Sequence, residues 1–292
     1  MYHGQIEGTD FVTLDKRFSG LFTGYMRVTR HWTGSIWAEG PAWFAAGRYL
    51  VWSDIPNNRM LRFVEESGQV SVFRPASNNS NGNTVDNQGR LVTCEHLTRR
   101  VTRTEFDGSV TVLADKWEGK RFNSPNDAVV KSDDSIWFTD PAYGIDGDNE
   151  GEPAKPEIDG CHVYRIDPKT GAVKRVIDDM VRPNGIIGTP DGKKLSVVDI
   201  RGRKTFAYDI AAEGTLTSPS GEQLESIAVP ECRPMSASAA RTRQGQEDAV
   251  HHRLHRALRG EDARPRSARS RHRLARAGAG VARCARLLRI LN

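Results

Sequence analysis

Short apolar runs that alternate with polar residues recur along most of the chain, from about Phe11 to Pro230. Turns rich in Gly, Asp, Asn and Pro separate them. Period-two alternation between such turns is typical of β-strands, and no long stretch has the 3.6-residue period of an amphipathic helix. Expected strands include residues 48–52, 90–94, 135–138 and 194–198. The pattern predicts an all-β fold.

These strand units repeat along the chain. An acidic residue ends one apolar run in each unit, at spacings of 41, 45 and 59 residues: Asp54, Glu95, Asp140 and Asp199. A second strand-like segment follows each of them. Repeats of this length with about four strands each are typical of β-propeller blades. We expect about four blades and a partial fifth before Cys232, and we expect Asp54, Asp140 and Asp199 to hydrogen-bond nearby backbone rather than to take part in catalysis.

The composition changes sharply near Cys232. Residues 1–232 hold 27 Lys and Arg against 33 Asp and Glu, whereas residues 233–292 hold 15 Arg, no Lys and 4 acids. All 22 aromatic residues lie in the first piece. We therefore divide the chain into a propeller domain, residues 11–232, and an Arg/Ala-rich tail, residues 233–292.

The tail lacks the β-branched and aromatic residues that strands need, so we expect it to be disordered or irregularly helical. GC-rich DNA read out of frame yields Arg, Ala, Gly, Pro and Ser codons, and we interpret the tail as a frameshift product. The alternative is a genuine basic tail that binds nucleic acid.

The rest of the composition narrows the function classes. No apolar run reaches 18 residues, and the N-terminus lacks a basic-then-apolar signal, so we expect a cytoplasmic protein without a membrane partner. The four cysteines lie far apart without zinc-finger spacing, and we expect unpaired thiols. The chain has no Walker loop, no GxGxxG and no GxSxG motif.

Oxygen-bearing side chains stand beside Gly or Pro just before several expected strands. The segments are AEGPAW at 38–43, RFNSPND at 121–127 and RPNG at 182–185. In a radially repeated β-fold, such turns deliver their side chains to a common hub. Carboxylate and amide oxygens are the ligands that hard cations prefer. The pattern predicts a cation site at the hub, although each of these residues alone is typical of an ordinary turn.

The same segments resemble the family of gluconolactonase, regucalcin (senescence marker protein) and related calcium-dependent lactonases. The similarity runs in order through AEGPAW, NGNTVDNQGRLVTCEHLTRRVTR, FNSPNDAVVKSDDSIWFTDPAYGID and RPNGIIGTPDGKK, and it covers about residues 11–232. It implies a six-bladed β-propeller, here incomplete with about four to five blades. It also implies hydrolysis of a sugar lactone such as glucono-1,5-lactone.

The resemblance implies a role for three residues. Glu39 and Asn184 would be ligands of one divalent cation, Ca²⁺ before Zn²⁺, Mg²⁺ or Mn²⁺, and Asn126 would contact substrate. The bound ion would polarise the lactone carbonyl and lower the pKa of a nearby water, and a carboxylate would take that water's proton. Independently of the resemblance, Asp127 is expected to brace the turn.

Two departures from the family pattern make impaired activity an expectation. The family's catalytic Asp follows a Pro-Asp-Gly motif that should lie shortly after Cys232, where this chain reads RPMSASAARTRQG, so the catalytic residue is unknown. Ser124 and Gly144 stand where animal members carry a substrate-binding Arg and Glu. The alternative functions are nucleic-acid binding through the tail and a propeller that binds a ligand without turnover.

The segment at 145–160 is an insertion between two repeats. Its residues Asp146–Gly151 nearly spell an EF-hand calcium loop. The following prolines and the strand-like flanks disagree with that motif. We expect a solvated acidic loop near the mouth of the channel.

Overall fold

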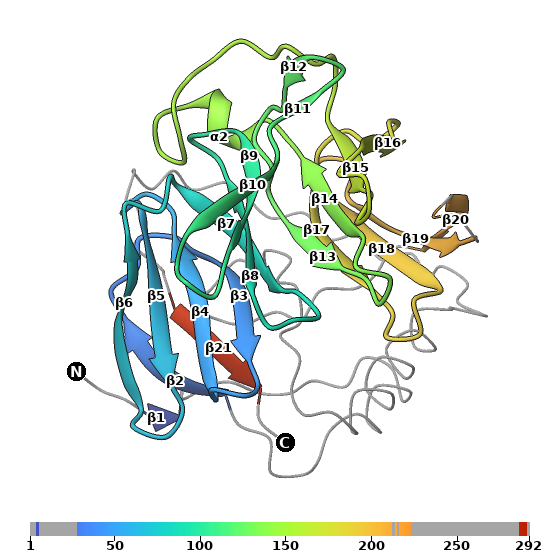
Figure 1. Ribbon diagram of the computed structural model, residues 1–292. Coiled ribbons are helices and arrows are strands. Elements are labelled where there is room, and N and C mark those ends of the chain that lie inside the picture. Colours follow the sequence, from blue (N-terminus) through green and yellow to red (C-terminus); the bar gives the residue numbers. More distant parts are fainter. Residues whose placement is uncertain (1–3, 6–27, 212–213, 215, 223–285, 291–292) are drawn as a thin grey trace, which may run out of the picture.

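The computed structural model describes residues 4–5, 28–211, 214, 216–222 and 286–290 (Figure 1). Their structure is almost entirely antiparallel β-sheet, as the alternation predicted. The described residues contain one short helix, α2 (Tyr143–Asp146), in the insertion. No helix among them is long and apolar enough to cross a membrane.

Four sheets of four strands follow one another along the chain. Each is a meander in which consecutive strands pair. The first holds β3 (Ala38–Phe44), β4 (Tyr49–Asp54), β5 (Arg59–Val64) and β6 (Gln69–Pro75). The second holds β7 (Ser80–Val85), β8 (Leu91–Glu95), β9 (Arg100–Thr104) and β10 (Val110–Ala114). The third holds β13 (Ala128–Val130), β14 (Ile136–Asp140), β15 (His162–Ile166) and β16 (Val173–Ile177). The fourth holds β17 (Pro183–Gly188), β18 (Lys194–Asp199), β19 (Lys204–Ile210) and β20 (Leu216–Glu222).

The first strands of successive sheets lie side by side, β3 against β7, β7 against β13 and β13 against β17. Two glycines permit this close approach. A Cβ on Gly40 would lie 2.2 Å from the carbonyl oxygen of Asn81, and one on Gly82 would lie 2.4 Å from that of Asn126. The sheets therefore radiate from a shared line of inner strands, as propeller blades do.

The core fills the wedges between neighbouring sheets. Consecutive residues of β14 point to opposite faces, so Phe138 packs toward the second sheet with Phe122 and Tyr164, while Trp137 packs toward the fourth sheet with Val197. Both side chains are fully buried. A strand buried on both faces reads as a continuous apolar run, which is why Ile136–Phe138 shows no alternation.

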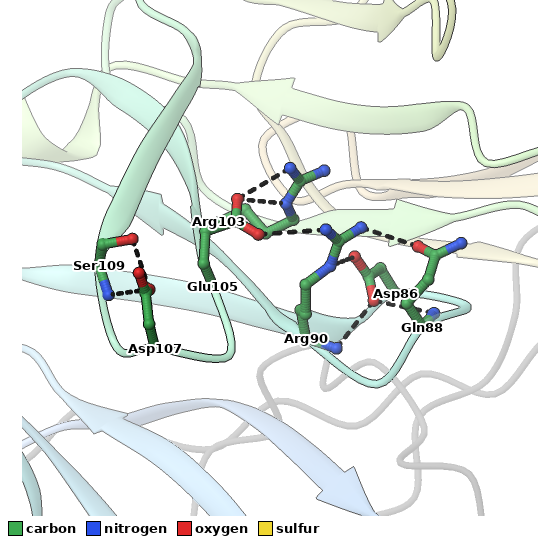
Figure 2. Close-up of polar contacts among 7 residues, drawn as sticks. All are labelled: Asp86, Gln88, Arg90, Arg103, Glu105, Asp107 and Ser109. Atoms are coloured by element: carbon green, nitrogen blue, oxygen red, sulfur yellow. Dashed lines mark hydrogen bonds and ion pairs between the residues drawn. The ribbon is translucent and has the colours of Figure 1, made fainter.

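An ion-pair network ties together the two turns at the far end of the second sheet (Figure 2). Asp86 accepts hydrogen bonds from the backbone N–H and the Nε of Arg90, both at 2.8 Å. Arg90 also contacts Glu105 at 3.1 Å, and Glu105 in turn accepts from Arg103. The network lies at the end of β7 opposite Asn81, so it fixes the hairpins without entering the hub.

Three smaller pairings complete the described residues. The hairpin β11 (Lys116–Trp117) and β12 (Lys120–Arg121) follows the second sheet, and β2 (Val28–Thr33) pairs with β1 (Gly4–Gln5) and β21 (Arg286–Ile290). The strand β21 differs from the irregular or helical structure expected for residues 233–292, because strand pairing there satisfies the backbone. The rest of that tail and both predicted ends of the propeller domain, residues 11 and 232, lie outside the described residues.

Candidate functional site

A narrow polar recess opens where the four inner strands meet. It is lined by a residue pair from each of the first three sheets or their approaches and by one residue of the fourth: Glu39, Gly40, Asn81, Gly82, Asn126, Asp127 and Asn184. The structure thus brings together the three residues that the sequence singled out, Glu39, Asn126 and Asn184. It adds Asn81, which the sequence reasoning missed.

Strand-end carboxylates set the backbone that leads to these side chains. Asp54 accepts hydrogen bonds from the N–H groups of Ile36 and Trp37, at 2.8 and 3.4 Å. In the third sheet, Asp140 accepts from Asn123 and Ser124, both at 2.8 Å. Trp37 stands two residues before Glu39, and Ser124 stands two residues before Asn126.

The fourth sheet repeats this clamp. Asp199 accepts from the N–H groups of Val181 and Arg182 at 2.8 and 2.9 Å, two residues before Asn184. The second sheet varies it, because Glu95 accepts from the side-chain amide of Asn78 at 3.2 Å. All four acids are buried, and the backbone hydrogen bonds confirm the role predicted for Asp54, Asp140 and Asp199.

Bulges then turn the side chains inward. The register of the inner strand shifts between Glu39 and Ala42 in β3, between Ser80 and Asn83 in β7, and between Pro183 and Ile186 in β17. A bulge adds an unpaired residue and re-aims the side chains beside it. Glu39, Asn81 and Asn184 all stand at these irregularities, which explains why strand residues can face the hub.

Asp127 braces two sheets as well as lining the recess. Its Oδ1 accepts from the N–H of Ala128 and its Oδ2 accepts from the N–H of Ile186, both at 3.0 Å. The predicted bracing role is therefore observed, and it extends from the third sheet to the fourth. The side chain of Asn184 also hydrogen-bonds that of Tyr143.

The electrostatics of the recess favour a positively charged ligand. Desolvation, with the nearby charge of Asp127 adding to it, raises the pKa of Glu39 from 4.5 to about 8. The ionised form of Glu39 is disfavoured because no positive charge in the described part of the chain compensates it. Its neighbours supply neutral amide oxygens, a donor set that suits a hard cation. Among the described residues, no three His, Cys, Asp or Glu side chains gather as a metal cluster, so any such site depends on these asparagines.

His96 lies directly behind two of the asparagines. Its ring is fully buried, and its Nε2 lies 3.2 Å from Nδ2 of Asn81 and 3.5 Å from Nδ2 of Asn126. On the other side, its Nδ1 lies 3.6 Å from a carboxylate oxygen of Glu150. Burial lowers the pKa of His96 to about 4, so the ring is neutral at neutral pH.

The insertion contributes Glu150 to this region. Asp146, Asp148 and Asn149 are exposed, as expected for an acidic loop, but the Glu150 side chain is only 20% exposed. Desolvation raises its pKa. An ion pair of 2.7 Å between Asp146 and Arg182 anchors the loop to the segment that leads into Asn184.

Ser124 and Gly144 fill their positions by tight packing. The Ser124 hydroxyl accepts from the N–H of Gly144 at 2.9 Å and donates to the carbonyl of Pro141 at 2.6 Å. A Cβ on Gly144 would lie 2.6 Å from the Cβ of His96. This corner of the site is therefore closed by backbone and His96 rather than by long polar side chains.

The repeat itself contained the signal for Asn81. The clamp acid follows the recess residue by 14 or 15 positions in every sheet: Glu39 and Asp54, Asn81 and Glu95, Asn126 and Asp140, Asn184 and Asp199. No comparable rule identifies His96 or Glu150. His96 comes from a turn after β8 and Glu150 from the inserted loop, and neither lines the recess itself.

Comparisons with known proteins point to one family. The family model of the SMP-30/Gluconolactonase/LRE-like region matches residues 37–236. A gluconolactonase of Zymomonas mobilis is 31% identical over 198 residues, 62% of this chain and 54% of that protein, so the chain spans about half the length of this relative. A lactonohydrolase of Aspergillus oryzae is 29% identical over 133 residues, 38% of this chain and 30% of that protein.

Solved structures agree with this assignment. A gluconolactonase of Xanthomonas campestris is 35% identical, with a TM-score of 0.66 over 78% of this chain and 72% of that one. A regucalcin of Agrobacterium tumefaciens shares the fold at 17% identity, with a TM-score of 0.51 over 65% of this chain and 60% of that one. The β-propeller fold class predicted from the repeats is confirmed, while the number of blades beyond the four described sheets stays a prediction.

Proposed function

The chain belongs to the SMP-30/gluconolactonase/LRE-like family, and we propose that it hydrolyses a sugar lactone, such as glucono-1,5-lactone, with the help of one divalent cation. The names of its relatives from Zymomonas mobilis and Xanthomonas campestris support the lactone as substrate class. The observation that carries the proposal is the convergence of Glu39, Asn126 and Asn184 on one recess.

In this proposal the chain's own residues bind and orient the reactants. Glu39 and Asn184 hold the cation, Ca²⁺ before Zn²⁺, Mg²⁺ or Mn²⁺, through a carboxylate and an amide oxygen. Asn126 orients the lactone beside them. When bound, the cation polarises the lactone carbonyl and makes the attacking water more acidic. Glu39 releases its proton on binding the cation, because the ion favours the ionised carboxylate.

The described residues of the recess offer no good proton acceptor for the attacking water. Asp127 is a poor candidate because both of its oxygens accept backbone N–H groups. The family's catalytic Asp is expected just after Cys232, outside the described residues, and that stretch of the sequence contains no acid. We therefore expect slow turnover. The same observation favours, as a second candidate, a propeller that binds a lactone without hydrolysing it.

Acid release from glucono-1,5-lactone, recorded above the spontaneous rate, tests the proposal. We expect EDTA to abolish the enzymatic rate and Ca²⁺ to restore it. Glu39→Gln should abolish the enzymatic rate even when Ca²⁺ is added. Glu66→Gln, on an exposed turn, should leave the rate unchanged. A rate that survives both EDTA and Glu39→Gln contradicts the proposed function. Lactone binding without turnover supports the second candidate.

A further inference from the structure

The direction of an asparagine amide decides what it can bind. The group presents an acceptor, Oδ1, and a donor, Nδ2, about 120° apart in one plane. A cation or a substrate hydroxyl donor needs the oxygen, whereas a flipped amide presents N–H groups and repels a cation. At the recess, something must therefore fix the amides of Asn81 and Asn126.

His96 is placed to do so. Its Nε2 lies 3.2 Å from Nδ2 of Asn81 and 3.5 Å from Nδ2 of Asn126. Asn81 belongs to the second sheet and Asn126 to the approach to the third, and both amides meet the same nitrogen of the buried ring. If Nε2 carries a lone pair, both amides turn their N–H groups toward it. Each Oδ1 then points away from His96.

Glu150 faces the other nitrogen of the ring, Nδ1. Nδ1 of His96 is buried and lies 3.6 Å from a carboxylate oxygen of Glu150, and the backbone of Glu150 also favours a proton on the ring. A proton on Nδ1 is attracted to that carboxylate, whereas a lone pair there is repelled. The partner of one ring nitrogen sets the tautomer of the other. The contact therefore favours Nδ1–H and leaves Nε2 as an acceptor.

From this geometry we propose that His96 is a positioning residue. Its Nε2 accepts hydrogen bonds from Asn81 and Asn126 and thereby presents their amide oxygens to the recess. Glu150, from the inserted loop, holds His96 in the Nδ1–H tautomer. Asn81 becomes a further oxygen donor of the site. The consequence for ligand binding rests on the proposed function, but the tautomer does not.

The tautomer is tested on the metal-free chain by nitrogen NMR after ¹⁵N-histidine labelling at neutral pH. The signals of His96 are assigned as those lost in His96→Phe, or by through-bond transfer on the wild-type chain if that variant does not fold. We expect a protonated Nδ1 and an unprotonated Nε2, and we expect Glu150→Gln to weaken this preference. A protonated Nε2 in the wild-type chain overturns the proposal, whatever the chain binds.

The consequence for binding is tested by calorimetric titration with Ca²⁺. Loss of a residue that orients a metal ligand costs about 10–100-fold in affinity, and we expect His96→Phe to show a loss in that range. His162→Phe is the matched control, because His162 is also buried but bonds the carbonyl of Asp159 in another part of the third sheet. We expect the control to keep wild-type affinity.

Coupling to Asn81 separates positioning from general damage. If His96 acts through the amides, its replacement should cost less affinity once Asn81→Ala has removed one of them. Equal affinity losses for His96→Phe and His162→Phe, or strictly additive effects with Asn81→Ala, overturn the proposal. A wild-type chain that binds no Ca²⁺ contradicts the proposed function instead, and the tautomer measurement then decides the role of His96.

Discussion

Asp140 accepts a hydrogen bond of 2.8 Å from the backbone N–H of Ser124, two residues before Asn126 enters the recess. The same relationship joins Asp54 to the approach to Glu39 and Asp199 to the approach to Asn184. The recess is therefore built by repetition. In the first, third and fourth sheets, the second strand ends with an aspartate that fixes the backbone leading to a recess residue, whereas Glu95 of the second sheet holds the side chain of Asn78 instead.

Removing this clamp should destabilise the fold. Asp140→Ala leaves the buried N–H groups of Asn123 and Ser124 without partners. Each unsatisfied buried group costs about 1–3 kcal/mol, so we expect a loss of about 3 kcal/mol in the free energy of unfolding, measured by urea titration. Asp115→Ala, at an exposed position, is the control and should change it little. Equal effects of the two substitutions would show that the clamp contributes nothing.

Gly40 is needed for the close contact between the first two sheets. Its φ of +56° disfavours other residues, and a Cβ would lie 2.2 Å from the carbonyl oxygen of Asn81. Gly68 has a similar φ of +67° with open space around it. We expect Gly68→Ala to cost about 1 kcal/mol from backbone strain alone. Gly40→Ala should cost clearly more in the same thermal or urea unfolding measurement.

The comparison isolates the clash, because both substitutions share the backbone penalty. Equal costs for Gly40→Ala and Gly68→Ala would mean that the inner strands can move apart freely. That result would contradict the tightly closed hub.

Glu39 should make the stability of the metal-free chain depend on pH. Its pKa is 4.5 when unfolded and about 8 when folded, so the folded chain binds more protons between these values. Stability attributable to Glu39 is therefore greatest below pH 4.5, decreases as pH rises toward about 8, and is constant above it. In EDTA, Glu39→Gln should match wild type near pH 4.5 and exceed its free energy of unfolding by on the order of 3 kcal/mol at pH 9.

Asp140 has its own raised pKa, from 3.8 to about 7, because of its burial. It is present in both chains, so the difference between wild type and Glu39→Gln isolates Glu39. Urea unfolding at pH 5, 7 and 9 measures this difference. A difference that stays constant across this range would contradict the desolvated carboxylate on which the cation proposal depends.

The sequence could predict the parts of the site that the repeat encodes. Turn residues and strand-end acids recur with the sheets and indicate the segments that hold the site. The family resemblance singled out Glu39, Asn126 and Asn184 within these segments, and Asn81 could have been found by the spacing to its acid. Their roles as ligands and substrate contact stay predictions. Their convergence depends on how neighbouring sheets pack, which the repeat implies.

The sequence could not predict the contacts made across the repeat. His96 follows a strand, as many turn residues do, and only the packing of two sheets places its ring behind two amides. Glu150 lies in an insertion with an EF-hand-like composition, which indicated a solvated loop. Its inward position follows from the anchoring of that loop by Asp146 and Arg182, a contact over 36 residues of sequence.

The central claim is that Glu39 and Asn184, from the first and fourth sheets, hold one cation together. Calorimetric titration of the metal-free chain with Ca²⁺ tests it most directly, with wild type compared with Glu39→Gln, Asn184→Leu and the exposed control Glu66→Gln. The account predicts one Ca²⁺ per chain for wild type and Glu66→Gln, and loss of that binding in each of the other two variants. Unchanged Ca²⁺ binding in Glu39→Gln or Asn184→Leu would contradict it.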